Sequence, residues 1–389
     1  PMYHLRRLSA LVLSLAIAPL LFLPTPAAAA NEDNMPLVLS SASALLMEKE
    51  TGTILLQQNA HQKLEPASVT KIMTLLLTME AVDSGRLSLD ELVPVSAHAA
   101  GMGGSQVYLK EGEQLSVSDL IKCVAVVSGN DCAVALAERL AGSESAFVDQ
   151  MNQKAQALGM ADTHFANCTG LPAPGHLTSA WDIALMSREL ILRHPDIQQY
   201  TTIWTDSIRN GAFGLTNTNR LVRFYDGATG LKTGFTASAQ YCMSATAQRN
   251  GMELIAVVMK APTTAQRFQD ASSLLDYGFA NYALITPQPE SPLAPVDVLL
   301  GRSKTVQPQL QRECHLLVEK TQADQVTTRV DLAQDVQAPV DPGQTLGEFQ
   351  VYVGNELRDS VPIVAAQGVD RLSVPGLFSQ LLRRLLFAG

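Results

Sequence analysis

The sequence predicts an α+β protein in which a large mixed domain precedes a small all-β domain. Residues 42–60 contain two apolar runs around Glu50-Thr51-Gly52, which is the pattern of a β-hairpin. Helical spacing then prevails up to about residue 192. Strands return near residue 228, and Asn250-Gly251, a strong hairpin signal, joins two of them. This order predicts an antiparallel sheet whose early and late strands enclose a helical region in the sequence.

A proline-rich segment, "TPQPESPLAP", separates the mixed domain from the rest of the chain. Beyond it, apolar and polar residues alternate, and turn signals such as Asp341-Pro342-Gly343 predict a small all-β domain. The boundaries that we expect are a signal peptide over 1–30, a mixed domain over 31–286, a linker over 287–295, a β-rich domain over 296–368 and an amphipathic helix over 369–389.

Both ends of the chain carry apolar segments of the kind that meets membranes. Arg6 and Arg7 precede an apolar stretch and the alanines at 27–30, which predicts a cleaved signal peptide and export; an uncleaved anchor is the alternative. Near the C-terminus, apolar residues at helical spacing are flanked by arginines, which favours a helix lying in a membrane interface; a helix docked on the β-rich domain is the alternative. We therefore expect a peripheral protein on the outer face of the cytoplasmic membrane, in the periplasm or cell-wall space.

Charge and composition argue against several kinds of partner. The chain has 389 residues, a net charge of −9 and 5% aromatic residues, so it lacks the basic footprint and the stacking surface typical of nucleic-acid binding. Its five cysteines form no Cys-x-x-Cys pair and have no zinc-site spacing. We expect no nucleic-acid partner, no metal and no cofactor.

The segment "EPASVTK" contains a serine, Ser68, three residues before Lys71 at the start of an apolar helical run. Residues at this spacing are neighbours on one helical face, so a neutral Lys71 amine could take the proton of the Ser68 hydroxyl. An ordinary lysine, with a pKa of about 10.4, is a cation and cannot do so unless burial or a second cation favours the neutral form. Alone, this spacing is equally compatible with a plain helix start.

Two further motifs follow. Ser128-Gly129-Asn130 interrupts two apolar helical segments, which places a hydroxyl and an amide at a buried turn; a plain helix break is the alternative. Lys232-Thr233-Gly234 lies on an expected strand, where the glycine lets a substrate approach the edge and Lys232 supplies a second cation. An exposed strand with a guarding lysine is the alternative.

The order of the three motifs resembles that of the penicillin-recognising serine acyl-transferases. Residues 45–282 are similar to one subgroup, the serine-type D-alanyl-D-alanine carboxypeptidases among the low-molecular-weight penicillin-binding proteins. The resemblance extends to "GGSQVYLKEGEQLSVSDLIKCVAVVSGNDCAVALAE" and "HFANCTGLPAPGHLTSAWDIA". It implies a β-lactamase-like transpeptidase domain, with an antiparallel sheet covered by helices on both faces and a helical subdomain, followed by the β-rich domain and the C-terminal helix.

The resemblance also implies the chemistry. Ser68 would attack the penultimate D-alanine of a peptidoglycan stem peptide while Lys71 accepts its proton, and water would hydrolyse the acyl-enzyme. The resemblance makes Ser128, with Lys232, the proton path to the leaving amine, whereas Asn130 would hold the substrate. The backbone of Ser68 and Phe235 would supply the oxyanion donors. For the terminal carboxylate the expected partners are Lys232, Thr233 and, as a softer expectation, Arg267, with Gly234 leaving room; β-lactam antibiotics would bind covalently.

Several alternatives remain open. A D,D-endopeptidase would share every residue named. A class A β-lactamase needs a glutamate between the second and third motifs, and residues 163–181 contain no Asp or Glu, which favours a long-lived penicilloyl adduct. An inert wall-binding protein would not need the full set of motifs. A catalytic His176 with Asp182, or a role for Ser105 at the rim, is less favoured, because "GHLTSAWD" is typical of a loop entering a helix.

Overall fold

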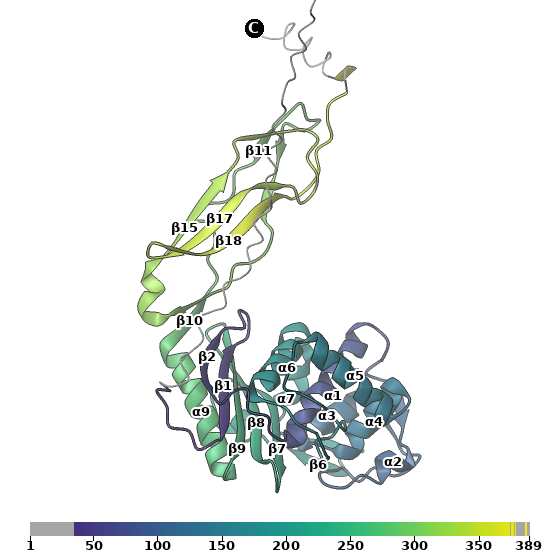
Figure 1. The fold of residues 1–389 in the computed structure, drawn as a ribbon. Coiled ribbons are helices and arrows are strands. Elements are labelled where there is room, and N and C mark those ends of the chain that lie inside the picture. Colours follow the sequence, from purple (N-terminus) through teal and green to yellow (C-terminus); the bar gives the residue numbers. More distant parts are fainter. Residues whose placement is uncertain (1–34, 374, 377, 379–385, 387–389) are drawn as a thin grey trace, which may run out of the picture.

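The computed structural model describes residues 35–373, 375, 376, 378 and 386. The expected signal peptide at 1–30 and most of the expected amphipathic helix at 369–389 therefore lie outside the described residues. Within the described part of the chain, no helix is long and apolar enough to cross a membrane. Figure 1 shows a mixed domain of strands and helices, from which a narrower β domain extends.

The centre of the mixed domain is an antiparallel sheet of five strands in the order β2-β1-β9-β8-β7. The two expected hairpins are confirmed, because β1 pairs with β2 and β8 with β9. β1 pairs with β9, so a strand that precedes the helical region in the sequence lies next to a strand that follows it. The strands are β1 (Ser43–Glu48), β2 (Ile54–Gln58), β7 (Ala228–Thr236), β8 (Gln240–Arg249) and β9 (Met252–Ala261).

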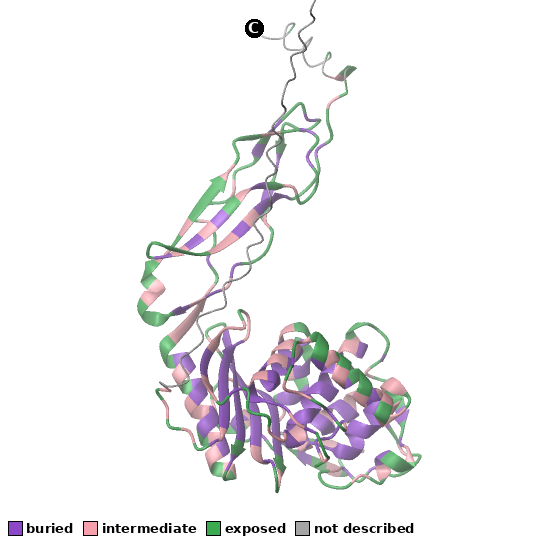
Figure 2. Ribbon diagram, viewed as in Figure 1, coloured by how far each residue is buried: buried purple, intermediate pink, exposed green. Residues whose placement is uncertain are grey.

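Helices cover both faces of this sheet, as expected (Figure 1). Alternate residues of β9 face opposite sides: Ala256 and Val258 lie in the core beneath α9 (Thr264–Asn281), whereas Val257 and Met259 lie in the core shared with the helical region. Because both faces are covered, the central strands are buried along most of their length (Figure 2).

The helical region between β2 and β7 packs on the sheet through α6, against β9 and β1, and through η2, α7 and α8, against β7. Its helices are η2 (Ala67–Thr70), α1 (Lys71–Asp83), α2 (Ala97–Ala100), α3 (Val117–Val127), α4 (Asn130–Ala141), α5 (Glu144–Ala157), α6 (Ala180–Arg193), η3 (Pro195–Ile197), α7 (Gln198–Thr201) and α8 (Leu221–Phe224). The region also contains two short antiparallel strand pairs: β3 (Leu92–Pro94) with β4 (Gln114–Ser116), and β5 (Thr205–Ile208) with β6 (Phe213–Thr216).

The β-rich domain consists of two small sheets, in the orders β13-β18-β17-β15 and β12-β11-β16, and one further strand pair. That pair joins β10 (Tyr282–Ile285), which directly follows α9, to β14 (Leu316–Glu319). The remaining elements are β11 (Val296–Leu299), β12 (Thr305–Val306), β13 (Pro308–Leu310), η4 (Lys320–Gln325), β15 (Val326–Leu332), β16 (Asp335–Gln337), β17 (Thr345–Val353) and β18 (Glu356–Ala365).

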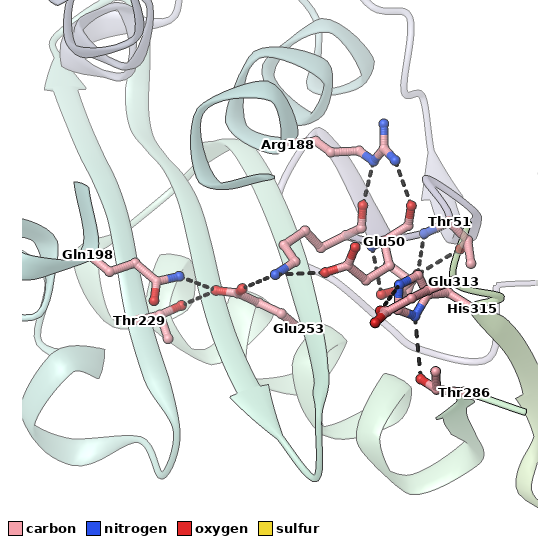
Figure 3. A network of polar contacts seen from close by, with 11 residues as sticks. Glu50, Thr51, Arg188, Gln198, Thr229, Glu253, Thr286, Glu313 and His315 are labelled. Atoms are coloured by element: carbon pink, nitrogen blue, oxygen red, sulfur yellow. Dashed lines mark hydrogen bonds and ion pairs between the residues drawn. The ribbon is translucent and has the colours of Figure 1, made fainter. Parts of the chain in front are cut away.

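A polar network ties the first hairpin to the rest of the mixed domain (Figure 3). The buried Glu253 carboxylate, on β9, forms an ion pair with Lys49 at 3.1 Å and accepts hydrogen bonds from Gln198 and from Thr229. Arg188, on α6, donates to the Lys49 and Glu50 carbonyls of the hairpin turn. The network therefore connects the start of β7, at Thr229, to β9, which β8 separates from β7 in the sheet, and to α7.

Candidate active site

Ser68 lies in η2, where the backbone is enclosed by two glycines. A Cβ atom on Gly170 would lie 1.8 Å from the Ala67 carbonyl oxygen, and one on Gly234 would lie 2.9 Å from the Ser68 nitrogen. Only glycine permits such a close backbone approach. The loop containing Gly170 and the strand β7 containing Gly234 thereby hold η2 between them.

Lys71 is the first residue of α1 and is completely buried, with 0% of its surface exposed. Its Nζ atom lies 3.0 Å from Ser68 Oγ and donates to the Thr169 carbonyl oxygen at 2.7 Å. Burial lowers the pKa of Lys71 to about 7, against an opposing influence of Cys168 and Asp131. At neutral pH, a large fraction of this amine is therefore unprotonated and has a lone pair for the Ser68 proton.

Ser128 and Asn130 lie at the junction of α3 and α4. Ser128 adopts a left-handed conformation with φ of 62°, which turns the chain sharply between the two helices. The Asn130 amide donates to the Gly103 carbonyl at 2.7 Å. Among the described residues, the buried Ser128 Oγ and Asn130 Oδ1 atoms have no hydrogen-bond partner. Buried polar atoms normally have one, so these two are suited to receive a substrate.

Lys232, Thr233 and Gly234 lie in the middle of β7, an edge strand of the sheet. Lys232 is only 1% exposed, and its Nζ atom donates to the Thr233 carbonyl at 2.9 Å. Burial, followed by the positive charges of Lys71 and Arg267, lowers the pKa of Lys232 well below its usual value. The charge of Lys71 thus disfavours a charge on Lys232, whereas burial is what lowers the pKa of Lys71. The sequence analysis expected Lys232 to serve as a second cation, but it is not what favours the neutral form of Lys71.

Thr218 is a site residue that the sequence did not reveal. Its Oγ1 atom lies 2.6 Å from Thr233 Oγ1, and its backbone nitrogen donates to the Val126 carbonyl, two residues before Ser128. The next residue, Asn219, donates to the Gly230 carbonyl of β7 at 2.8 Å. Thr218 therefore connects the segment before Ser128-Gly129-Asn130 to Lys232-Thr233-Gly234. It also places a second hydroxyl next to that of Thr233.

Comparison with known proteins identifies the family to which this arrangement belongs. Residues 28–263 match the family model described as D-alanyl-D-alanine carboxypeptidase. The chain belongs to this family. It is a serine-type D-alanyl-D-alanine carboxypeptidase. Residues 288–371 match a second model, described as the C-terminal domain of penicillin-binding protein 5.

Similar proteins cover nearly the whole chain. The D-alanyl-D-alanine carboxypeptidase DacF of Bacillus subtilis is 37% identical, over 93% of this chain and 95% of its own length. The DacC enzyme of Escherichia coli is 32% identical, over 90% and 89% respectively. Among solved structures, penicillin-binding protein 5 of Haemophilus influenzae is 29% identical, with a TM-score of 0.73. The superposition covers 87% of this chain and 100% of the Haemophilus protein chain.

A solved relative in a β-lactam complex also matches. Penicillin-binding protein D2 of Listeria monocytogenes, solved in the ampicillin-bound form, is 36% identical with a TM-score of 0.58. It covers 62% of this carboxypeptidase and 99% of that chain. These likenesses confirm the β-lactamase-like transpeptidase fold and its β-rich companion domain.

Arg267 and Phe235 of the carboxypeptidase both lie against Tyr241 but differ in their exposure. The Arg267 guanidinium comes from α9, is buried, and donates from Nη1 to the Gly234 carbonyl at 3.2 Å. It therefore supports the strand at Gly234. The Phe235 side chain, in contrast, is 54% exposed and packs against the Tyr241 ring, with 4.5 Å between their centroids.

His176 has a structural environment. Its Nδ1 atom accepts from the Ala166 backbone N–H at 2.9 Å, which makes Nε2 the protonated nitrogen that donates to Thr70 Oγ1 at 2.8 Å. Burial lowers the pKa of His176 to about 4, so the ring is neutral at physiological pH. Asp182 accepts hydrogen bonds from Asp162 and Thr163, and Ser179 provides the N-cap of α6.

A buried carboxylate next to Asn130 in the sequence accepts hydrogen bonds from the backbone of a nearby loop. The buried Asp131 carboxylate accepts the backbone N–H groups of Val107, Leu109 and Cys132, which fixes the loop carrying Ser105. The Ser105 carbonyl in turn accepts the Asn130 N–H at 2.7 Å. Within the described residues, no group of His, Cys, Asp and Glu is arranged to hold a metal ion.

The pKa of Lys71 predicts the pH dependence of acylation. Protonated Lys71 cannot accept the Ser68 proton, so activity is lost as the pH falls through about 7. The neutral fraction rises from about one tenth at pH 6 to about nine tenths at pH 8. We therefore expect the second-order rate constant for labelling by fluorescent penicillin to rise about tenfold over this range. A flat profile, with circular dichroism showing an unchanged fold, would contradict a titrating Lys71.

Proposed function

We propose that Ser68 is the nucleophile that this carboxypeptidase uses to remove the terminal D-alanine from peptidoglycan pentapeptides. The observation that carries the proposal is the 3.0 Å contact between Ser68 Oγ and the buried Lys71 amine. Lys71 accepts the Ser68 proton as Oγ attacks the carbonyl carbon of the penultimate D-alanine. The backbone N–H groups of Ser68 and Phe235 stabilise the oxyanion, and each such donor typically contributes about a hundredfold or more in rate.

Collapse of the tetrahedral intermediate requires a proton for the leaving D-alanine amine. Ser128, whose buried hydroxyl has no partner among the described residues, donates this proton and takes another from Lys232, which is protonated once the substrate carboxylate has raised its pKa. Asn130 binds the substrate backbone through its free Oδ1 atom. Water then hydrolyses the ester on Ser68 and releases the shortened peptide.

The subsite for the terminal carboxylate consists of Thr233, Thr218 and Lys232. The hydroxyls of Thr218 and Thr233 share one hydrogen bond at 2.6 Å, so one O–H group of the pair stays available to a carboxylate oxygen. The Lys232 ammonium adds a charge when the carboxylate is bound, because an anion nearby raises the pKa of a lysine. Arg267 acts behind the strand by holding the Gly234 carbonyl.

The same geometry explains slow turnover of penicillin. Residues 163–181 contain no Asp or Glu, and the atom of this loop that reaches Lys71 is the Thr169 carbonyl oxygen. A carbonyl cannot act as a general base toward water, so the penicilloyl ester lacks the activation that a class A β-lactamase provides. β-Lactams therefore act as long-lived covalent inhibitors of this protein.

Outside the catalytic site, the proposal keeps the domain boundaries expected from the sequence, with a linker at 287–295 and the β-rich domain at 296–368. The match of residues 288–371 to the C-terminal domain of penicillin-binding protein 5 supports this division. The protein is exported after removal of residues 1–30 and associates with the outer face of the cytoplasmic membrane through its C-terminal segment. No nucleic acid and no cofactor take part.

The nucleophile is tested with the substitution Ser68→Ala. We expect this variant to release no D-alanine from a pentapeptide ending in D-Ala-D-Ala, and to form no penicilloyl adduct in intact-protein mass spectrometry, because both reactions need the Ser68 hydroxyl. In the unmodified protein the adduct should persist for many minutes. Ser145→Ala, at an exposed position of α5, should behave as the unmodified protein. Release of D-alanine by a correctly folded Ser68→Ala variant would refute the assignment.

Thr218 is tested with Thr218→Val, which keeps the shape of the side chain and removes its hydroxyl. We expect kcat/KM for peptides with a free C-terminal carboxylate to fall about tenfold, because a hydrogen bond to a charged group contributes about 1.5 kcal/mol or more. Peptides with a C-terminal amide should lose less, and Thr218→Ser should restore the rate. Thr202→Val, which removes a hydroxyl bonded within its own helix, is the matched control. Equal losses on acid and amide peptides would refute this role.

Membrane association is tested by deleting residues 371–389. The apolar residues of this segment would supply most of the affinity for the bilayer interface, so the truncated protein should move to the soluble fraction after cell lysis. Its rate of D-alanine release from a soluble peptide should not change, because the catalytic domain ends well before the deletion. Unchanged membrane association would show that another part of the chain attaches the protein.

A further inference from the structure

A small polar pocket lies beyond the C-terminal end of β7, and part of its lining comes shortly before Ser68 in the sequence. It has a volume of about 180 Å³ and is lined by Lys63, Glu65, Leu177, Ser238 and Lys260, among others. Glu65 precedes Ser68 by one turn of chain, and its carboxylate accepts a hydrogen bond from Ser238, in the turn that follows β7. The pocket therefore lies between the catalytic η2 segment and the β7–β8 turn.

An irregularity in β9 directs Lys260 to this pocket. Between the pairs Met243–Val258 and Tyr241–Ala261, two residues of β9, Met259 and Lys260, oppose the single residue Cys242 of β8. Lys260 itself has φ of 57°, a left-handed conformation that is unfavourable for a lysine. In a regular strand, position 260 would follow 256 and 258 to the α9 face. The bulge turns the Lys260 side chain instead to the face of η2.

The pocket lies in the direction that the upstream part of a substrate must take. With the terminal carboxylate at Thr218 and Thr233 and the scissile carbonyl at the backbone of Ser68 and Phe235, the substrate runs along β7 toward its C-terminal end. In the described part of the chain, β7 pairs on one side only, with β8, so its other edge is open to an extended peptide. The residue before the scissile D-alanine then lies near Thr236, at the entrance to the pocket.

We propose that this pocket binds the side-chain end of the third residue of the stem peptide, and that it selects diaminopimelate over lysine. The inference rests on the function proposed above. The end of a diaminopimelate side chain carries both an ammonium and a carboxylate group. Glu65 matches the ammonium, and the two cations Lys63 and Lys260 match the carboxylate. A lysine side chain would offer only an ammonium group to a pocket that holds two lysines and one carboxylate.

The test compares three pentapeptides that end in D-Ala-D-Ala and differ only at the third residue: meso-diaminopimelate, the same residue with its side-chain carboxylate amidated, and L-lysine. For the unmodified full-length protein we expect kcat/KM for D-alanine release to be about tenfold higher with free diaminopimelate than with the other two. Partly exposed ion pairs contribute up to about fivefold each, and two lysines contribute here.

Substitution identifies the residues responsible. The double variant Lys63→Gln and Lys260→Gln should lower kcat/KM for the diaminopimelate peptide about tenfold, leave the lysine peptide within about twofold, and leave penicillin labelling unchanged. Lys304→Gln, the same change on an exposed lysine of the β-rich domain, is the control and should change none of the rates.

The outcomes separate this proposal from the function on which it rests. Equal rates on all three peptides, or a loss in the double variant that is the same for each, would overturn the pocket assignment while D-alanine release itself upholds the carboxypeptidase mechanism. No release from any of the three peptides would overturn the proposed function, and the pocket assignment with it.

Discussion

The site depends on the burial of two amines that cannot both carry a charge. Lys71 and Lys232 come from a helix and from a strand, and the fold removes both from water, which lowers both pKa values. A buried ammonium without a counter-ion costs several kcal/mol, so the protein must offer each amine oxygen acceptors and protect them with a well-packed shell. The carbonyl groups of Thr169 and Thr233 are these acceptors. Most of the surrounding packing can be understood as the means of keeping this pair dry and close to Ser68.

That packing joins parts of the chain that are far apart in the sequence. Gly170 and Gly234 let a loop and a strand touch the backbone of the nucleophile from two sides, and Thr218 connects α3 to β7. Glu253, in turn, anchors the start of β7 through Thr229. The position of Ser68 is therefore set by backbone contacts rather than by side chains that could change rotamer, which is the rigidity that the proposed oxyanion site requires.

The hairpins of the sheet and the three motifs of the site could be predicted from the sequence, because short stretches of residues determine them. Asn250-Gly251 and Glu50-Thr51-Gly52 form turns wherever they occur between apolar runs, and the three motifs keep a recognisable order. Thr218 and Lys260 could not be predicted. Thr218 acts through contacts with Val126 of α3 and Thr233 of β7, which only the folded chain brings together. Lys260 reaches its pocket only because of a bulge, which nothing in "VVMKAP" indicates. Residues 282–285 follow α9 directly yet form β10, because a partner strand from the second domain competes with local helix propensity.

The pairing of β10 with β14 changes the meaning of the proline-rich linker. Residues 282–285 precede the linker and residues 316–319 follow it, yet the two segments are hydrogen-bonded to each other. The strand pair thus bridges the two ends of the segment that contains the linker. A force on the β-rich domain acts on the hydrogen bonds of this strand pair before it extends the proline-rich linker. The strand pair therefore restricts how far the second domain can move relative to the first. If the C-terminal segment binds the membrane, as proposed above, this strand pair limits how far Ser68 can move from the membrane surface.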